Sequence, residues 1–284
     1  MRRVLGWVLI AVALVLPVGL CALLFGLRRF SRLVRRDVRA LLAQAARTRE
    51  GVVVTEEMLQ NLPEPVRRCL GYTGTVGKPF VNTVRLKQKG RMHPSAKGAW
   101  IPLEAEEYYS VQPPGFVWDA TMYRGPLPIA RGRDIYAGGK GRMLIKAGSL
   151  FIVVDDKGEE MDQGSMIRYL SEMIWFPTAF LGDNVSFEPI NDESARVTLT
   201  DVNKSLSATM YFDEEGRFTD FVAKRYRTVL GGYELETWST PTYEYGEHAG
   251  LKLPLRGGAV WKLPKGDLKY VDITITDLEY NIAR

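Results

Sequence analysis

The chain has 284 residues, which is enough for one or two domains, and its 46% hydrophobic and 25% charged residues are those of an ordinary folded protein rather than a disordered one. Residues 1–50 hold 10 basic and 2 acidic residues, a net charge of +8, so residues 51–284, with 28 basic and 31 acidic residues, carry −3. Because the basic excess lies beside a hydrophobic segment and not on the body of the protein, we expect no nucleic-acid partner.

Residues 4–27 contain no charged side chain. As a helix they would reach about 36 Å, more than the roughly 30 Å hydrocarbon core of a bilayer. A cleaved signal peptide is the alternative, but its hydrophobic region is shorter, about 7–15 residues. The sequence therefore predicts an uncleaved transmembrane anchor at residues 1–27 that contacts the bilayer through residues 4–27.

Residues 28–50 form a basic amphipathic helix and a linker in this prediction. One side of the helix is apolar, and the other gathers Arg28, Arg29, Arg32, Arg35, Arg36 and Arg39. Two interpretations stay open: an interfacial helix whose arginines meet anionic head groups, or a solvated stalk. Six arginines follow the apolar segment and two precede it, which favours the cytosolic side for the body.

Residues 51–284 make up the predicted globular domain. A helix is expected over residues 56–70, split by Pro63 and Pro65. From residue 81 onward apolar residues alternate with polar ones, and short polar turns separate the segments, including a hairpin turn at residues 138–141. Residues 150–154 are apolar on both faces and predict a covered central strand. Many consecutive strands indicate an antiparallel meander, here a large curled sheet or half-barrel.

The stretch 161–181 interrupts the strands with an amphipathic helix, for which Asp162 is the expected N-cap and Pro177 the stop. Its apolar half is formed by Met166, Ile167, Tyr169, Leu170, Met173, Ile174 and Phe176. Because such a surface needs shelter, we expect the helix to cover the sheet as a lid. The predicted fold class is therefore mainly β (α+β), with an N-terminal transmembrane helix.

The sequence offers little chemistry. His93 and His248 lie in turn-like surroundings without the partner a histidine base needs. No zinc, calcium or phosphate-loop motif is present, so we expect no metal, no cofactor and no assigned catalytic residue, and the chain is more typical of a non-enzyme.

Polar groups on apolar surfaces are the candidate site residues. Glu107 lies on the apolar face of its strand, Lys146 ends an apolar strand, and Arg168 and Glu172 are spaced to pair on the helix. Three interpretations stay open: a structural ion pair, a polar ligand contact, or a catalytic acid. With these four, the predicted ligand-binding residues are Tyr109, Trp118, Met166, Leu170 and Met173.

Four stretches carry a family resemblance: residues 62–68 (LPEPVRR), 113–118 (PPGFVW), 160–164 with 175–178, and 277–281 (DLEYN). They resemble an uncharacterised bacterial family of membrane-anchored domains of unknown function, which implies no activity and no catalytic residue. The order of elements also resembles the lipoprotein-localisation carriers, half-barrels whose helices cover a lipid-binding cavity. That likeness implies a domain outside the cytoplasmic membrane, so the side of this expected single-pass protein of the bacterial cytoplasmic membrane stays open.

Three functions follow from these observations. The favoured one is a membrane-anchored module that holds a lipid or other apolar ligand between sheet and helix. The alternatives are an enzyme on a membrane-derived substrate, with Glu107 or Glu172 as acid or base, and a scaffold for a membrane complex. The sequence identifies neither the ligand nor a protein partner.

Overall fold

The computed structural model describes residues 2–46, 49–93 and 98–282. Its helices are α1 (Arg2–Gln44), α2 (Glu64–Thr73) and α3 (Glu159–Glu172), with 3-10 turns at Glu56–Leu59, Met173–Trp175 and Pro177–Leu181. The strands are β1 (Thr83–Met92), β2 (Ile101–Ser110), β3 (Gly115–Arg124), β4 (Leu127–Ala137), β5 (Lys140–Ala147), β6 (Phe151–Lys157), β7 (Val185–Asn191), β8 (Ser194–Asp201), β9 (Lys204–Phe212), β10 (Phe218–Val229), β11 (Gly232–Ser239), β12 (Thr242–His248), β13 (Leu251–Lys262) and β14 (Leu268–Tyr280).

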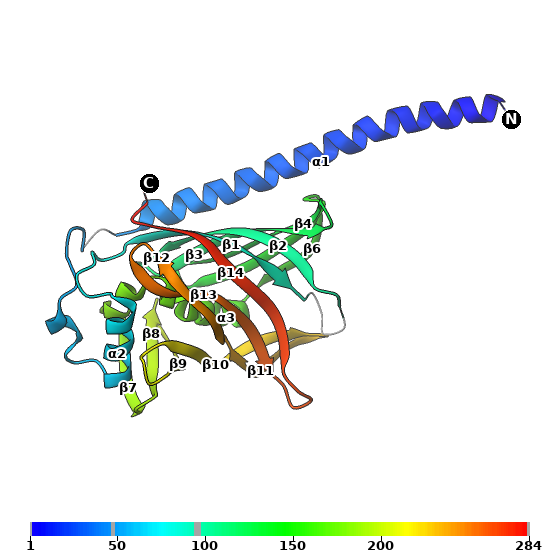
Figure 1. Ribbon diagram of the computed structural model, residues 1–284. Coiled ribbons are helices and arrows are strands. Elements are labelled where there is room, and N and C mark those ends of the chain that lie inside the picture. Colours follow the sequence, from blue (N-terminus) through cyan, green and yellow to red (C-terminus); the bar gives the residue numbers. More distant parts are fainter. Residues whose placement is uncertain (1, 47–48, 94–97, 283–284) are drawn as a thin grey trace.

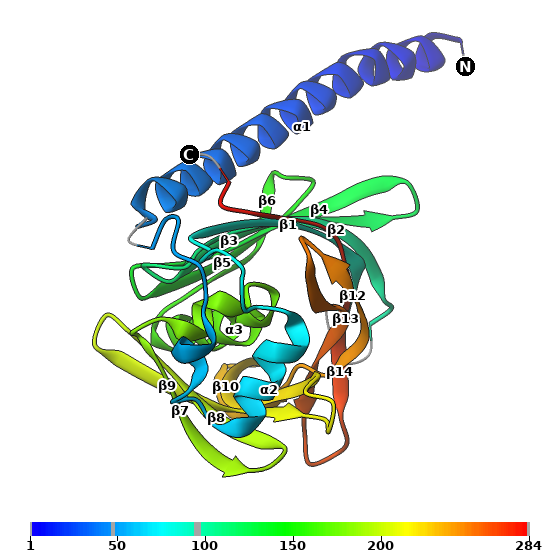
Figure 2. The ribbon, with the colours of Figure 1, turned by 60° about the vertical axis from the view of Figure 1, so that its left-hand side comes forward.

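The described strands form one antiparallel sheet, in the order β6-β5-β4-β3-β2-β1-β14-β13-β11-β10-β9-β8-β7, with β12 on β13. Most neighbours in sequence are neighbours in the sheet, but β6 and β7 lie at its two edges and β11 pairs with β13 rather than with β12. The pairing of β1 with β14 joins the two halves of the chain. The sheet curls around its own concave face (Figure 1; Figure 2). The mainly β, curled antiparallel fold predicted from the alternating pattern is confirmed.

Helix α3 lies inside the curl rather than over its mouth (Figure 2). It contacts β4, β5 and β6 on one wing of the sheet and β9 and β10 on the other, so it fills the space between the wings. The predicted helix 161–181 is shorter, since α3 ends at Glu172 and two 3-10 turns follow. Asp162 is not the N-cap, because Gly158 holds that position. The Asp162 carboxylate instead accepts a hydrogen bond from the backbone N–H of Gly141 and pairs with Lys140.

Helix α1 runs along the outer, convex face of the sheet, and its N-terminal half extends beyond it (Figure 1). Phe30, Val34 and Leu41 are buried against Val117 and Leu144 of the sheet. The apolar side of the predicted basic helix therefore packs on protein. The boundary expected at residues 27 and 28 lies within continuous helix.

Among the described residues, no helix is both long and apolar enough to cross a membrane. The expected localisation, a single-pass protein of the bacterial cytoplasmic membrane, is wrong on this finding. The side chains of residues 2–16, 18 and 20, on which most of the bilayer contact expected for residues 4–27 depends, lie outside the described part.

Two smaller predictions have opposite outcomes. The helix over residues 56–70 is split as expected, into a 3-10 turn and α2, with Pro63 as the N-cap of α2. The apolar strand at 150–154 is not a covered central strand, because β6 is an edge of the sheet. Phe151, Ile152 and Val153 are 73%, 60% and 64% exposed. An unbroken apolar run gives a strand but cannot state its position in the sheet.

Candidate functional site

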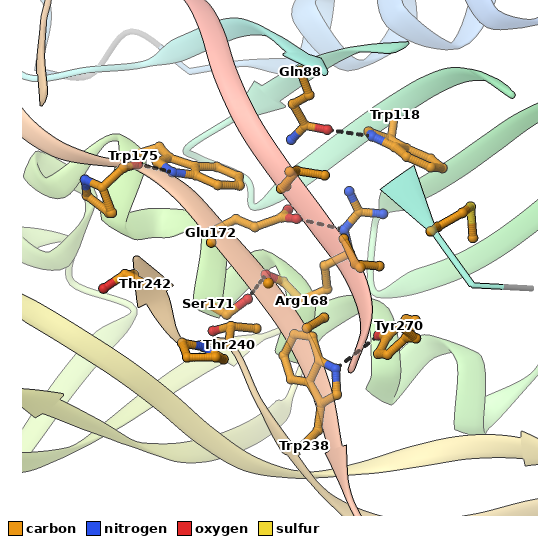
Figure 3. Close-up of a pocket in the computed structure, with 18 of the residues that line it drawn as sticks. Gln88, Trp118, Arg168, Ser171, Glu172, Trp175, Trp238, Thr240, Thr242 and Tyr270 are labelled. Atoms are coloured by element: carbon orange, nitrogen blue, oxygen red, sulfur yellow. Dashed lines mark hydrogen bonds and ion pairs between the residues drawn. The ribbon is translucent and has the colours of Figure 1, made fainter. Parts of the chain in front are cut away.

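A cavity of about 210 Å³ lies between the concave face of the sheet and α3 (Figure 3). Most of its wall is apolar or aromatic, from Met92, Leu103, Trp118, Met143, Ile145, Ile174, Trp175, Phe218, Trp238 and Tyr270. Strands β1 to β5 supply one side and β10, β11, β13 and β14 the other, so the cavity exists only because β1 and β14 pair. Such a concave, mainly apolar space with a few polar groups is typical of a site for a small ligand.

The polar side of α3, not its apolar side, faces this cavity. Arg168, Ser171 and Glu172 line it, and Figure 3 shows them together at its wall. Met166, Leu170 and Met173, expected as ligand contacts, are instead 1–2% exposed and belong to the packed core, outside the lining. The helix is enclosed on both sides, so its apolar half packs on the sheet and its polar half meets the remaining space.

Arg168 is the centre of a buried ionic cluster. Its Nε lies 2.8 Å from Glu172 Oε1, its Nη1 2.8 Å from Asp134 Oδ2 and its Nη2 2.7 Å from Glu107 Oε1. The guanidinium carbon also lies 4.7 Å from the ring centroid of Phe116 and 5.1 Å from that of Trp118. One guanidinium thus holds three carboxyl groups against an aromatic wall, so the cluster has more acidic groups than basic ones.

Hydrogen bonds extend the cluster into the sheet. Gln88 donates to Glu107 Oε2 over 3.1 Å and accepts from the Trp118 indole over 2.9 Å. The Tyr109 hydroxyl donates to Glu172 Oε2 over 3.0 Å. Of the predicted site residues, the structure therefore brings Glu107, Tyr109, Trp118, Arg168 and Glu172 together, and three of them, Trp118, Arg168 and Glu172, line the cavity.

Burial controls the charge of the cluster. It raises the pKa of Glu107 well above its ordinary value, and it also raises the pKa values of Asp134 and Glu172, although Arg168 opposes each shift. Burial alone would lower the pKa of Arg168, but the three carboxylates together raise it well above its ordinary value. The guanidinium therefore stays charged, while the surplus carboxylates tend to keep a proton.

Lys146 lies elsewhere. It stands opposite Arg131 in the pairing of β4 with β5, and Arg131 donates to Ser31 of α1 on the outer face of the sheet. Lys146, expected as the polar end of an apolar strand, therefore belongs to the face away from the cavity.

The cavity also has polar groups that the sequence did not single out: Asp134 on the side formed by β1 to β5, and Arg225, Arg256 and Tyr270 on the opposite side. Each occupies an ordinary position in a strand, without a motif around it. Arg225 of β10 and Tyr270 of β14 lie within 3.2 Å of each other although β11 and β13 separate their strands in the sheet. An alternating pattern indicates which face a residue takes, but not which strand stands opposite.

The chain belongs to a family of unknown function, DUF6544, whose model matches residues 52–273. A search of curated proteins found no match. Among solved structures, the chain is similar to a LolA superfamily protein from Nitrosomonas europaea, at 10% identity and a TM-score of 0.41, over 82% of this chain and 96% of that one.

Two further solved structures have comparable similarity. One is a putative outer membrane lipoprotein-sorting protein domain from Vibrio parahaemolyticus, at 10% identity and a TM-score of 0.39, over 80% of this chain and 92% of that one. The other is a DUF1329 family protein from Desulfovibrio piger, at 7% identity and a TM-score of 0.41, over 72% and 88%. The expected resemblance to a family of unknown function is confirmed by the family match.

Proposed function

We propose that this member of the DUF6544 family binds a lipid or another apolar ligand in the cavity between α3 and the concave face of the sheet. The observation that carries the proposal is the cavity itself, whose lining combines Trp118, Trp175 and Trp238 with aliphatic side chains. Removing apolar surface of a ligand from water stabilises the complex by roughly 25 cal/mol per Å². The polar groups at α3 are few and would orient a ligand rather than supply most of the affinity.

Native mass spectrometry of the purified full chain, together with the fluorescence of the neutral apolar probe N-phenyl-1-naphthylamine, tests this proposal. We expect a co-purified apolar molecule, and saturable binding of the probe with enhanced emission. Met143→Trp adds a large ring to the cavity wall and should weaken probe binding at least fivefold, since less space remains.

Leu235→Trp is the matched control, because Leu235 is 50% exposed on β11 and lies outside the lining. It should bind the probe as the native chain does. Failure to detect any bound molecule, combined with no saturable probe binding by the native chain, would refute the proposal. Equal weakening by both variants would place the probe outside the cavity and refute it as well.

A further inference from the structure

Among the described residues, one arginine of the cavity wall forms no ion pair with a carboxylate. Three arginines line the cavity. Arg168 holds three carboxylates, and Arg256 pairs with Glu244 over 2.6 Å and with Asp272 over 3.1 Å. In the described part of the chain, Arg225 makes no ion pair. Its Nε donates to the carbonyl of Gly164 over 3.0 Å, and its Nη1 donates to the Tyr270 hydroxyl over 3.2 Å.

Aromatic rings hold the Arg225 guanidinium in place. Its central carbon lies 4.6 Å from the ring centroid of Trp238 and 5.9 Å from that of Trp261. Stacking of this kind favours a cation but leaves the edge of the guanidinium free to donate. A half-buried cation kept on aromatic rings, with a carbonyl and a phenol as its hydrogen-bond partners, leaves its charge available to a ligand.

Tyr270 adds a second free donor at the same place. Its hydroxyl oxygen accepts from Arg225 Nη1 and from the Trp238 indole, the latter over 3.0 Å; Figure 3 shows the Trp238 bond at the cavity. Both partners can only donate, so they occupy the lone pairs of the oxygen and leave its proton to be donated onward. No described acceptor takes that proton. The guanidinium and the phenol therefore present unfilled donors to the same space.

We propose that the ligand is an amphiphile with an oxyanion head, a carboxylate or a phosphate monoester, held by Arg225 and Tyr270 while its apolar chain occupies the rest of the cavity. This inference rests on the proposed function and adds the class of head group. Guanidinium groups suit both oxyanions because their N–H donors match a pair of oxygens. The three carboxylates of the acidic cluster make their ion pairs with Arg168, and Arg225 acts on Asp134 only as a more distant charge.

A set of ten-carbon ligands tests the head group on the native full chain. Decanoate, decyl phosphate, decanol and decylammonium each compete with N-phenyl-1-naphthylamine at pH 7.5, alongside acetate and inorganic phosphate. We expect decanoate or decyl phosphate to bind at least about tenfold more tightly than decanol and decylammonium, because a hydrogen bond to a charged group contributes more than a neutral one. Comparison of the two anions identifies the preferred head.

Substitutions at Arg225 and Tyr270 test where the ligand head group binds. Arg225→Gln should weaken the preferred anion by about 10- to 100-fold and leave decanol within twofold, and Tyr270→Phe should weaken it by about 2- to 10-fold. Arg227→Gln is the matched control, because Arg227 lies two residues along β10, pairs with Glu234 over 2.7 Å and does not line the cavity. It should leave all affinities unchanged. If Arg225→Gln fails to fold, the head group is tested instead with Arg225→Lys, which keeps the charge, and with the ligand series on the native chain.

The failures of the two proposals differ. If the native chain does not bind the probe, the proposed function falls. If it binds the probe but decanol or decylammonium competes as well as the anions, the function stands and the oxyanion head is refuted. If Arg225→Gln loses affinity for decanol as much as for the anion, Arg225 has a structural role. If acetate or inorganic phosphate binds as tightly as the ten-carbon anions, the site takes free anions only. Either result overturns the inference.

Discussion

Arg168 has two roles in this protein, since it holds α3 on the sheet and also lines the cavity. Glu107 and Asp134 come from the sheet and have no exposed surface, and Glu172 comes from α3. Each carboxylate costs free energy to remove from water, and the shared guanidinium offsets that cost only while all partners are in place. The cluster therefore fixes the position of α3 against β2 and β4, and it forms the polar part of the cavity wall.

Removal of Arg168 should destabilise the protein severely. In Arg168→Met the carboxylates of Glu107 and Asp134 lose their cation while buried, so we expect a loss of about 3–5 kcal/mol in the free energy of unfolding. Urea denaturation measures it. Arg196→Gln is the control, because the Arg196–Glu188 pair is exposed and should contribute less than about 1 kcal/mol. A loss in Arg168→Met no larger than in the control would contradict the ionic account.

The same cluster makes stability depend on pH. Because burial raises the pKa of Glu107 above its ordinary 4.5, the folded state keeps a proton that the unfolded state loses as the pH rises. The unfolded chain then binds fewer protons, and stability from this group, fully present below pH 4.5, is lost as the pH rises through the folded-state pKa. The glutamine side chain of Glu107→Gln does not ionise, so this variant lacks that pH dependence.

The stability of Glu107→Gln relative to the native chain should therefore increase from about pH 4.5 upward, by at most about 1.4 kcal/mol per pH unit. Urea titrations between pH 4 and pH 8.5 give the difference directly. Glu188→Gln, at an exposed carboxylate, supplies the reference. A difference between Glu107→Gln and the native chain that stays constant over this range would show that Glu107 is ionised in both states.

At the level of elements, α3 depends on a close approach to β5. A Cβ added at Gly141 would lie 2.4 Å from Ser165 Oγ and 2.6 Å from the backbone oxygen of Met161. The oxygen belongs to the helix backbone and cannot turn aside, so Gly141→Ala must push α3 from the sheet. We expect a loss of about 1–3 kcal/mol, measured by urea denaturation.

Gly71→Ala is the matched control, since Gly71 lies in α2 and nothing stands within 4 Å of its added Cβ. Alanine favours a helix there, so stability should stay equal or rise by up to about 1 kcal/mol. If Gly141→Ala proved as stable as the native chain, α3 would be more loosely packed on β5 than the distances indicate.

Helix α1 is held on the outer face by apolar packing and by polar contacts, among them the Arg131–Ser31 hydrogen bond and a buried ion pair. Arg133 Nε of β4 lies 2.7 Å from Asp37 Oδ2, and both side chains are below 10% exposed. Burial lowers the pKa of Arg133, an effect that the charge of Asp37 opposes. Asp37→Asn removes that charge, and α1 should detach more often because detachment exposes Arg133 to water.

Hydrogen exchange should show this change as at least tenfold faster exchange of α1 amides between residues 30 and 44, with β13 unaffected. Arg39→Gln, at an exposed position on the same helix, should leave these rates as they are. Unchanged exchange in Asp37→Asn would mean that apolar packing by Phe30 and Val34 suffices to hold α1.

For the whole molecule, local patterns predicted more than long-range ones. Alternation in the sequence placed Glu107 and Tyr109 on the inner face, and the helical period predicted the Arg168–Glu172 pair. It could not give the β1–β14 pairing, which joins residues almost 200 positions apart. Asp134, Arg225 and Tyr270 were not singled out, because an alternating pattern does not show which strands face each other across the cavity. The helix was expected to cover the sheet as a lid because its apolar half needs shelter, whereas α3 lies inside the curl and contacts both wings of the sheet.

Pairing of β1 with β14 should also make the two wings of the sheet one cooperative unit. Val84 of β1 stands opposite Tyr280, and α3 contacts both wings, so neither wing can unfold without exposing the core of the other. Ile275→Ala, at a residue 3% exposed in β14, should lower the free energy of unfolding by about 2–5 kcal/mol.

Hydrogen exchange should report this same loss for β3 and for β13, since their most protected amides exchange through global opening. Ile190→Ala, at a residue 48% exposed on the edge strand β7, should change neither. Loss of protection confined to β13 and β14 would show that the wings open separately, and a cavity walled by both would then lack a rigid second side.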